Sequence, residues 1–326
     1  MEPNGREVVV LAAGGTIAMR GERAVPALGA EALVAAVPAL AGVRGLSART
    51  VVSLPGAQMT LSDALAVARA AAEEGRSGRG VVVAHGTDTL EETALLCDLI
   101  YDGEAPIVLT GAIRPGSHTS ADGPGNLVDA VAVARSRAAE SLGALVVFGG
   151  EVHAARHARK DDSAGPAAFS SPACGPLGRV VEGRVAIALR PARRRPALDV
   201  RRLDLRVPVV ATALGDDGSL LEAAAADGVD GLVLVALGGG HVGPPVLEAL
   251  RSAAARVPVV VALRPSRGAF LASTYGFEGA EGDIRATGAI PAGPLSPQAA
   301  RMQLLACIGA GLERDRTAAF FAEDDP

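Results

Sequence analysis

Aromatic residues are almost missing from this sequence: there is no tryptophan, and only two tyrosines and six phenylalanines occur among 326 residues. The hydrophobic cores must therefore be aliphatic, and much of the apolar composition is alanine and valine. Valine-rich runs favour strands and alanine-rich runs favour helices, and here the two alternate. A chain of this length suits two unequal α/β domains.

Cysteine is also scarce, and acidic residues outnumber basic ones. Cys97, Cys174 and Cys307 are far apart and odd in number, which indicates neither a disulfide framework nor a cysteine-based zinc site. The net charge of −5 does not suit nucleic-acid binding. The most basic segment, Arg190–Arg206, contains prolines and aspartates, which favours a solvated linker over a phosphate or RNA contact.

Long apolar runs do not occur either. No stretch reaches the roughly 18 consecutive apolar residues of a membrane helix. The apolar run near the N-terminus is too short for a secretory signal. We therefore expect a soluble, cytoplasmic protein without membrane or nucleic-acid partners.

Lysine is the rarest basic residue. Of the 31 basic residues, 30 are arginines and one, Lys160, is a lysine. Arginine stays charged in proteins whereas a lysine can lose its proton, so a lysine retained in such a sequence is a candidate for proton transfer. Chance survival of one surface lysine is the alternative. The neighbours Arg159, Asp161 and Asp162 favour the functional interpretation, because they form a loop without an obvious structural role.

Apolar runs and helix-like segments alternate along the first 150 residues. We predict strands at residues 7–13, 48–54, 80–84, 106–110 and 142–148, and helices at 31–37, 62–74, from about 88 onward and 125–139. This order predicts parallel strands with right-handed crossovers. The Gly-, Pro- and Ser-rich residues 151–176 are expected to form long loops.

The same alternation begins again after the basic segment. Strands are predicted at 207–211, 231–237 and 257–263, and helices at 220–226, 245–255 and 297–318. The expected fold is α/β with two domains. A larger, doubly wound, flavodoxin-like N-terminal domain occupies residues 1–190, a linker 191–210, and a smaller C-terminal α/β domain 211–326.

A glycine-rich turn follows the first predicted strand, in Leu11–Ala18 (LAAGGTIA). Gly14 and Gly15 allow the backbone to approach a ligand closely, and Thr16 then presents a hydroxyl at the carboxyl end of the strand. The glycine spacing does not match the phosphate-binding loop pattern.

A polar cluster follows the third predicted strand, in Ala84–Ala94 (AHGTDTLEETA). Ligands bind at the carboxyl ends of strands in open parallel sheets, so the hydroxyl of Thr87 and the carboxylate of Asp88 are reactive-site candidates. A structural interpretation competes for part of this segment: positions 88 and 91, and 89 and 92, have capping-box spacing, which would make Glu91 a helix-start residue only.

These two motifs, together with TGAIRPGSHTSADGPGNL, RKDDSAGPAAF and LSPQAARMQL, resemble the signature of the bacterial-type L-asparaginase and glutaminase-asparaginase family over most of the chain. The resemblance implies an amidohydrolase that converts L-asparagine to L-aspartate and ammonia through a threonine nucleophile and an acyl-enzyme. It implies no metal and no other cofactor. The catalytic residues would be Thr16, Thr87, Asp88 and Lys160, and which threonine attacks first stays open.

Substrate-binding residues are implied by the same resemblance. They are Ala57, Gln58, Thr87, Asp88 and Glu281, the last being an acid lent by a neighbouring subunit. The small-molecule substrate would be L-asparagine or also L-glutamine, and the assembly a homodimer or homotetramer.

Three positions depart from the family pattern. The segment Met19–Ala30 lacks the usual loop tyrosine, Ala57 stands where serine is common, and His241 occupies the position of a substrate-binding asparagine. A different small amide is therefore an alternative substrate.

Other classes of protein compete with the amidase. An NADP-binding oxidoreductase could use Gly238–Gly243 (GGGHVG), which has the Gly-x-Gly-x-x-Gly spacing after a strand, although no acidic ribose partner follows. A metal hydrolase could use His153 and His157 if both lay on one helix face, but the His-Glu-x-x-His pattern is missing. A non-enzymatic binding module is the third alternative. Asn126 suits either site shaping or helix capping.

Overall fold

The computed structural model describes residues 6–20, 25–26, 28–191, 196–226 and 228–322. Internal contacts divide the chain into two units, Met1–Leu198 and Asp199–Pro326. The domains at 1–190 and 211–326 remain a prediction. Part of the predicted linker, residues 192–195, lies outside the described residues.

Within its described residues, the first unit contains one large sheet, two small two-stranded sheets and four α-helices. Its strands are β1 (Val8–Gly14), β2 (Met19–Arg20), β3 (Val25–Pro26), β4 (Leu46–Leu54), β5 (Gly80–Ala84), β6 (Ile107–Thr110), β7 (Ala144–Phe148), β8 (Glu151–Ala154), β9 (Arg159–Lys160), β10 (Phe169–Ser170), β11 (Gly178–Val181) and β12 (Arg184–Ile187). Its helices are α1 (Ala30–Ala35), α2 (Leu61–Arg76), α3 (Leu90–Ile100) and α4 (Gly123–Arg135), with 3₁₀ turns η1 (Thr16–Ala18), η2 (Pro38–Leu40), η3 (Gly56–Gln58) and η4 (Arg137–Ala139).

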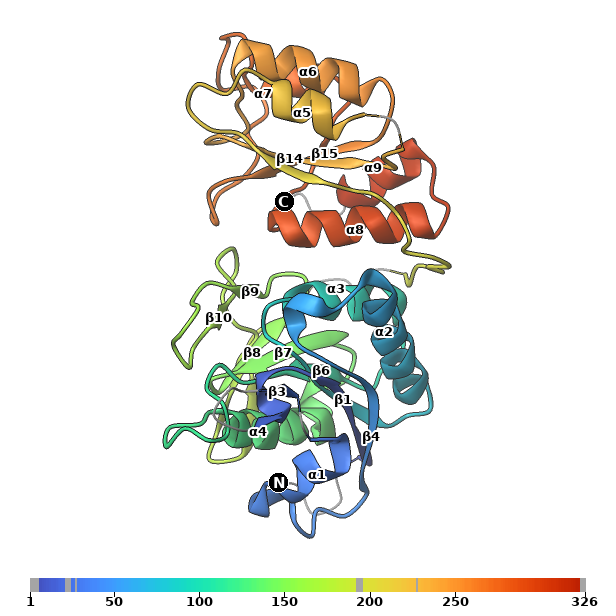
Figure 1. Ribbon diagram of the computed structural model, residues 1–326, viewed down its shortest axis with the longest axis vertical. Coiled ribbons are helices and arrows are strands. Elements are labelled where there is room, and N and C mark those ends of the chain that lie inside the picture. Colours follow the sequence, from blue (N-terminus) through green and yellow to red (C-terminus); the bar gives the residue numbers. More distant parts are fainter. Residues whose placement is uncertain (1–5, 21–24, 27, 192–195, 227, 323–326) are drawn as a thin grey trace. The chain divides into compact units, whose positions relative to one another are not determined.

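The strand order of the large sheet is β12-β11-β8-β7-β6-β5-β1-β4. The five strands from β4 to β7 run parallel. In chain order they lie 2-1-3-4-5, the flavodoxin-like arrangement, which confirms the predicted fold class. Helices α1 and α4 cover one face of the sheet, and α2 and α3 the other (Figure 1). Because both faces are covered, all residues of β1 and β5 are buried, as their continuous apolar sequences predict.

The expectation of long loops at residues 151–176 is partly wrong. Strand β8 extends the sheet antiparallel to β7, and β9 and β10 form a separate hairpin. The sequence analysis also does not predict β11 and the edge strand β12, which alternate between exposed and more buried positions around a turn at Glu182 and Gly183, both with positive φ. Such short, half-polar strands have none of the continuous apolar character of the central ones.

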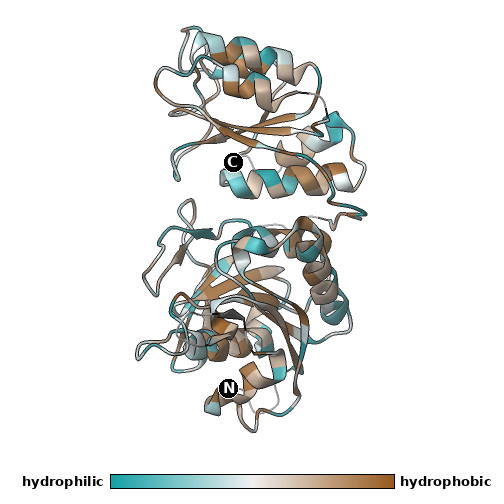
Figure 2. Cartoon of the chain, viewed as in Figure 1, coloured by the Kyte–Doolittle hydropathy of each residue, from teal (hydrophilic) through white to brown (hydrophobic). Residues whose placement is uncertain are grey.

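In the described part of the second unit, a four-stranded parallel sheet lies between helices. Its strands are β13 (Val209–Ala211), β14 (Leu232–Ala236), β15 (Val259–Leu263) and β16 (Ile290–Pro291), which lie in that order in the sheet. Helices α5 (Ser219–Ala224), α6 (Pro244–Ala254) and α7 (Glu281–Ala286) contribute to the core on one face, and α8 (Pro297–Gly309) packs on the other. Figure 2 shows the hydrophobic residues concentrated in the strands of each sheet.

The single helix predicted at residues 297–318 is wrong in its extent. The chain forms α8 and then α9 (Arg314–Ala322), separated at Gly311, whose φ is 77°. A left-handed glycine is a common helix terminator, because it lacks the Cβ that makes this conformation costly. No described helix is both long enough and apolar enough to cross a membrane.

Candidate active site

The order of the parallel strands reverses between β1 and β5. Two crossovers that leave such neighbouring strands in opposite directions open a crevice at the carboxyl ends, which is where ligands bind in doubly wound sheets. Thr16 follows β1, and Thr87 and Asp88 follow β5. The topology therefore places three of the four predicted catalytic residues at this switch point.

Glycines bring the loops of this crevice into backbone contact. A Cβ added to Gly15 would lie 2.3 Å from the Cα of Gly86, and one added to Gly86 would lie 2.7 Å from the Cα of Gly56. Gly15 also has a φ of 78°. The loops after β1, β4 and β5 can thus meet only because these positions carry no side chain.

Thr16 lies in η1, directly after this contact. Its side chain is partly exposed, and its hydroxyl has no hydrogen-bond partner among the described residues. The next residues, Ile17 and Ala18, are buried and anchor the turn in the core. The arrangement leaves the Thr16 hydroxyl accessible on a fixed backbone.

Three predicted residues form one hydrogen-bonded cluster. The Lys160 Nζ donates to Thr87 Oγ1 over 2.9 Å and to Asp88 Oδ1 over 3.0 Å. Thr87 is buried, whereas 21% of the Lys160 side chain and 58% of the Asp88 side chain are exposed. An amine in direct contact with a buried hydroxyl and a carboxylate is the geometry required for activating a hydroxyl or a water.

Lys160 is carried by the β9–β10 hairpin, where it pairs with Phe169. The buried ring of Phe169 packs against Phe148 of β7, with ring centroids 5.0 Å apart. In addition, the backbone N–H of Lys160 donates to Glu91 Oε2 over 2.6 Å. The hairpin is therefore tied both to the sheet and to α3.

The capping-box interpretation of the α3 start is wrong. Thr89 is the residue before the helix but makes no side-chain capping bond. Its hydroxyl donates instead to the carbonyl of Gly56, while Asp88 is bound by Lys160 and Glu91 accepts the Lys160 amide. The polar residues of this segment thus make long-range contacts in place of local ones.

His85 is buried beside the cluster. Its Nδ1 lies 2.8 Å from the Gly86 carbonyl and its Nε2 lies 3.1 Å from the Met59 sulfur. Burial lowers the pKa of His85 to about 4, although the Gly86 carbonyl acts to raise it. The imidazole is therefore neutral near pH 7 and has a packing role.

Asn126 shapes the neighbouring loops and does not cap the helix. Its Nδ2 donates to the Gly111 carbonyl over 3.0 Å and to Asp122 over 3.2 Å, and its Oδ1 accepts from the Gly149 N–H over 3.1 Å. Asp122, which precedes α4, in turn accepts from two backbone N–H groups after β6. Asn126 thus links the chain after β6 to the chain after β7.

The predicted substrate-binding residues lie in different units. Ala57 and Gln58 are exposed in η3, next to the glycine contact. Glu281 belongs to the second unit and is fully buried there. The structure thus brings Gln58 near the cluster through Gly56, and the role of Glu281 towards a neighbouring subunit remains a prediction.

The Glu281 carboxylate has several partners within its own unit. It accepts the backbone N–H groups of Thr274 and Tyr275, and His241 Nε2 lies 3.3 Å from its Oε2. Burial acts to raise its pKa, but the N–H donors and His241 outweigh it and hold the pKa below its usual value. His241 also packs edge-on against Tyr275 and Phe277.

The glycine loop at 238–243 does not resemble a dinucleotide site. A bridge between Leu237 and His241 closes it, and Gly240 lies against the ring of Phe270. The following helix, α6, begins with Pro244 and Pro245, which have no N–H to donate to a phosphate. This geometry disfavours the oxidoreductase alternative.

The histidines of the metal-hydrolase alternative do not share a helix. His153 is buried in β8, where its Nδ1 lies 3.0 Å from Ser171 Oγ, and His157 lies in the turn after β8. Within the described ranges, no group of three histidine, cysteine or acidic side chains is placed to hold a metal ion.

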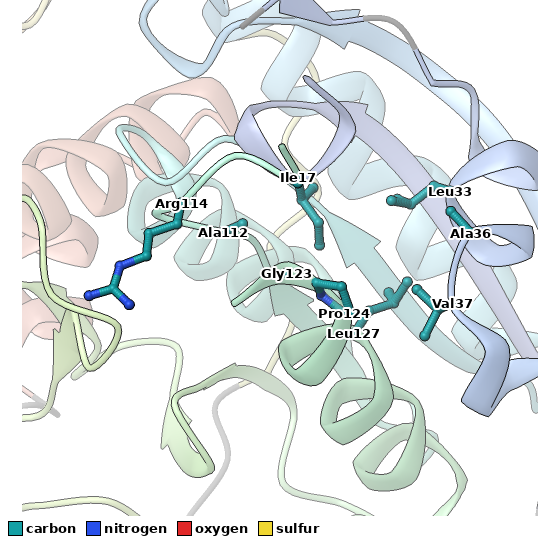
Figure 3. A pocket seen from close by; sticks show the side chains of 10 residues that line it. Ile17, Leu33, Ala36, Val37, Ala112, Arg114, Gly123, Pro124 and Leu127 are labelled. Atoms are coloured by element: carbon teal, nitrogen blue, oxygen red, sulfur yellow. The ribbon is translucent and has the colours of Figure 1, made fainter. Parts of the chain in front are cut away.

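A small apolar pocket of about 130 Å³ lies beside η1 (Figure 3). Ile17, Leu33, Val37 and Leu127 line it, and the guanidinium of Arg114 points away from these side chains. None of the four predicted catalytic residues lines this pocket.

The fold and the amine–hydroxyl–carboxylate cluster define a two-unit α/β protein with a hydrolase-like site. Family models for the asparaginase N-terminal domain and the glutaminase/asparaginase C-terminal domain match residues 7–193 and 206–321. The chain therefore belongs to the asparaginase family, which confirms the resemblance seen in its sequence.

Individual relatives agree with this family. The chain is 39% identical to a glutaminase-asparaginase of Pseudomonas fluorescens over 57% of its length and 54% of the relative's. It is 35% identical to a probable L-asparaginase of Deinococcus radiodurans over 85% of its length and 86% of the relative's. The crystal structure of a probable cytoplasmic L-asparaginase from Campylobacter jejuni superposes with a TM-score of 0.87 at 29% identity, covering 97% of this chain and 99% of that one. The chain spans only 54–59% of the length of the first three curated relatives that it matches.

Proposed function

We propose that this protein is an L-asparaginase that hydrolyses the side-chain amide of L-asparagine to L-aspartate and ammonia. The observation that carries the proposal is the contact of Lys160 with Thr87 and Asp88 at the switch point of a chain in the asparaginase family. L-Glutamine is a second substrate candidate, supported by relatives named glutaminase-asparaginase.

The proposed reaction has two stages. In the first, the Thr16 oxygen attacks the amide carbon, its proton passes to the leaving nitrogen, and ammonia departs to leave an acyl-enzyme. In the second, a water attacks the ester, and its proton returns to the Thr16 oxygen as L-aspartate leaves. Lys160 in its neutral form can take a proton from Thr87 or from that water, which its contact with Thr87 Oγ1 supports.

Backbone N–H groups of the glycine loops would stabilise the oxyanion in both stages. The half-exposed carboxylate of Asp88 can bind the α-ammonium group of the substrate while it holds Lys160. Gln58, exposed in η3, is proposed to bind the substrate. Ala57 beside it supplies no hydroxyl for the substrate's α-carboxylate. Glu281 would complete the site of a second copy in a homodimer or homotetramer.

The cellular location is also a proposal. We infer a cytoplasmic protein, supported by the name of the Campylobacter jejuni relative, although a Haemophilus influenzae relative is named periplasmic.

The test is ammonia release from L-asparagine and L-glutamine by wild type, Thr16→Ala and Thr16→Ser. We expect release by wild type, its loss in the alanine variant and partial activity in the serine variant, which retains a hydroxyl. Equal rates for wild type and Thr16→Ala would exclude Thr16 as the nucleophile. Absence of release from either amide by the folded wild type would contradict the proposal and favour another small amide.

A further inference from the structure

Residues 87–91, between β5 and the first turn of α3, bind both the backbone and the side chain of Lys160. Thr87 and Asp88 bind the terminal Nζ, at 2.9 and 3.0 Å, while Glu91 in the first turn of α3 binds the backbone N–H at 2.6 Å. These partners lie 69–73 residues from Lys160 in sequence. Both the backbone N–H and the terminal amine of Lys160 are therefore held by the β5–α3 segment.

The hairpin that carries Lys160 has little regular structure to hold it in place. Strands β9 and β10 have two residues each and form a sheet of their own, outside the large one. The Phe148–Phe169 ring contact anchors β10, and the Glu91 bond is the contact that fixes the amide of Lys160 itself. Without that bond the backbone of Lys160 could move away from α3 and draw Nζ away from Thr87.

We infer that Glu91 is a positioning residue for the proposed reaction: its ionised carboxylate holds the backbone N–H of Lys160 and thereby fixes the amine against Thr87 and Asp88. The inference rests on the proposed function for its effect on catalysis, but the bond itself can be tested separately. A carboxylate accepts a shorter and stronger hydrogen bond from an N–H than a neutral group does, so ionisation of Glu91 matters.

The surroundings of Glu91 put its ionisation near neutrality. Burial raises the pKa of Glu91 to about 7, and the Lys160 N–H acts to lower it. Of the nearby charges, Glu92 and Asp161 raise the pKa and Arg159 lowers it. Below pH 7 the carboxyl is therefore mostly neutral and its bond to Lys160 weaker, and above pH 7 it is ionised and the bond stronger.

The other elements packed against α3 are α2, β6 and β7. Strands β6 and β7 contain no titratable residue. In α2, Glu74 pairs with Arg49 and Arg79, Arg76 pairs with Asp102, and Asp63 is bound by Thr60. The remaining charged residues of α2 are Arg69 and Glu73.

The lysine content of the chain allows a direct test. Because Lys160 is the only lysine in 326 residues, protein labelled with ¹⁵N-lysine gives a single backbone amide resonance, that of Lys160. Its chemical shift reports the hydrogen bond to Glu91 without any reference to activity. The experiment compares wild type, Glu91→Gln and Glu92→Gln between pH 5.5 and 8.5, a range set about one and a half units around neutrality.

In wild type, the Lys160 amide resonance is expected to titrate with a midpoint near the pKa of Glu91 and to lie downfield at high pH. In Glu91→Gln it lies upfield and loses this titration, and kcat falls roughly tenfold with little change in KM, as for loss of a hydrogen bond to a charged group. Glu92→Gln is the matched control: the bond persists, and the midpoint moves to lower pH because a neighbouring negative charge is gone.

The inference is overturned if the wild-type amide does not titrate in this range, a result that needs no folded variant. It is equally overturned if Glu91→Gln keeps the wild-type resonance and its pH dependence, or if kcat is unchanged in an active enzyme. Failure of the proposed function looks different: the amide titrates as expected, but wild type releases no ammonia.

Discussion

Replacement of Lys160 by arginine separates the chemistry of the site from its stability. In the wild type, Lys160 Nζ lies 2.9 Å from Thr87 Oγ1 and 3.0 Å from Asp88 Oδ1. Arginine keeps the positive charge and can donate to the same two side chains. It cannot lose a proton in a protein, so it cannot act as a base. Loss of a positioned general base costs about 10²–10⁴-fold in rate, and we expect kcat of Lys160→Arg to fall by that factor.

The effect on folding should be small by comparison. With 58% of the Asp88 side chain exposed, the ion pair is largely solvated, and such pairs contribute about 0–1 kcal/mol. Urea unfolding of Lys160→Arg should therefore give a free energy of unfolding within about 1 kcal/mol of wild type.

The assay is the initial rate of ammonia release over a range of L-asparagine concentrations, with urea unfolding on the same samples. A variant that keeps more than about a tenth of the wild-type kcat would refute a base role for Lys160, because a charge alone would then suffice. If the variant loses both activity and a large part of its stability, the Lys160–Asp88 ion pair is structural. Lys160→Gln, which removes the charge, distinguishes this structural role from a catalytic role of Lys160.

Two further predictions concern the surroundings of this cluster. Gly86→Ala should lower the free energy of unfolding by about 1–3 kcal/mol in urea, since its Cβ would lie 2.7 Å from the Gly56 backbone. Gly125→Ala in α4, with open space around its Cβ, should instead raise it by about 0.5–1 kcal/mol, and equal effects would contradict the contact. The pKa of His85 is lower in the folded than in the unfolded protein. The free energy of unfolding should therefore fall by about 3 kcal/mol through this residue as the pH drops from 6.5 towards 4. The raised pKa of Glu91 changes the free energy of unfolding in the opposite direction between pH 4.5 and 7. The measurement is therefore the difference in unfolding free energy between wild type and His85→Phe at each pH. A difference that does not vary with pH would contradict the prediction.

The central strands could be predicted from the sequence because their environment is uniform. Residues 80–84 form β5 as expected, since a strand covered on both faces must be apolar throughout. Strand β8, at Glu151–Ala154, was missed because it is short and carries Glu151 and His153, whose partners come from β11 and Ser171. The sequence of a strand does not reveal which residues will lie beside it in the sheet. A short segment with polar residues can therefore not be assigned to a strand or a loop from its sequence.

The site shows the same division. The expectation that Lys160 belongs with Thr87 and Asp88 agrees with their contacts, and the rarity of lysine was the clue available from the residues alone. For Glu91, the spacing to Asp88 predicts only a helix-capping role, because local spacing is the signal that the sequence offers at this position. Its actual partner, the Lys160 amide, is 69 residues away and is fixed only by the fold.

The contacts between Gly15, Gly56 and Gly86 have a consequence for how this protein can change its substrate. Where these three glycines meet, the loops of the crevice are in contact through their main chains. Under the proposed function, substitutions at exposed positions on the same loops, such as Ala57 and Gln58, can therefore alter substrate recognition while these backbone contacts stay in place. The two exposed positions tolerate other side chains, whereas the three glycines leave almost no room for variation.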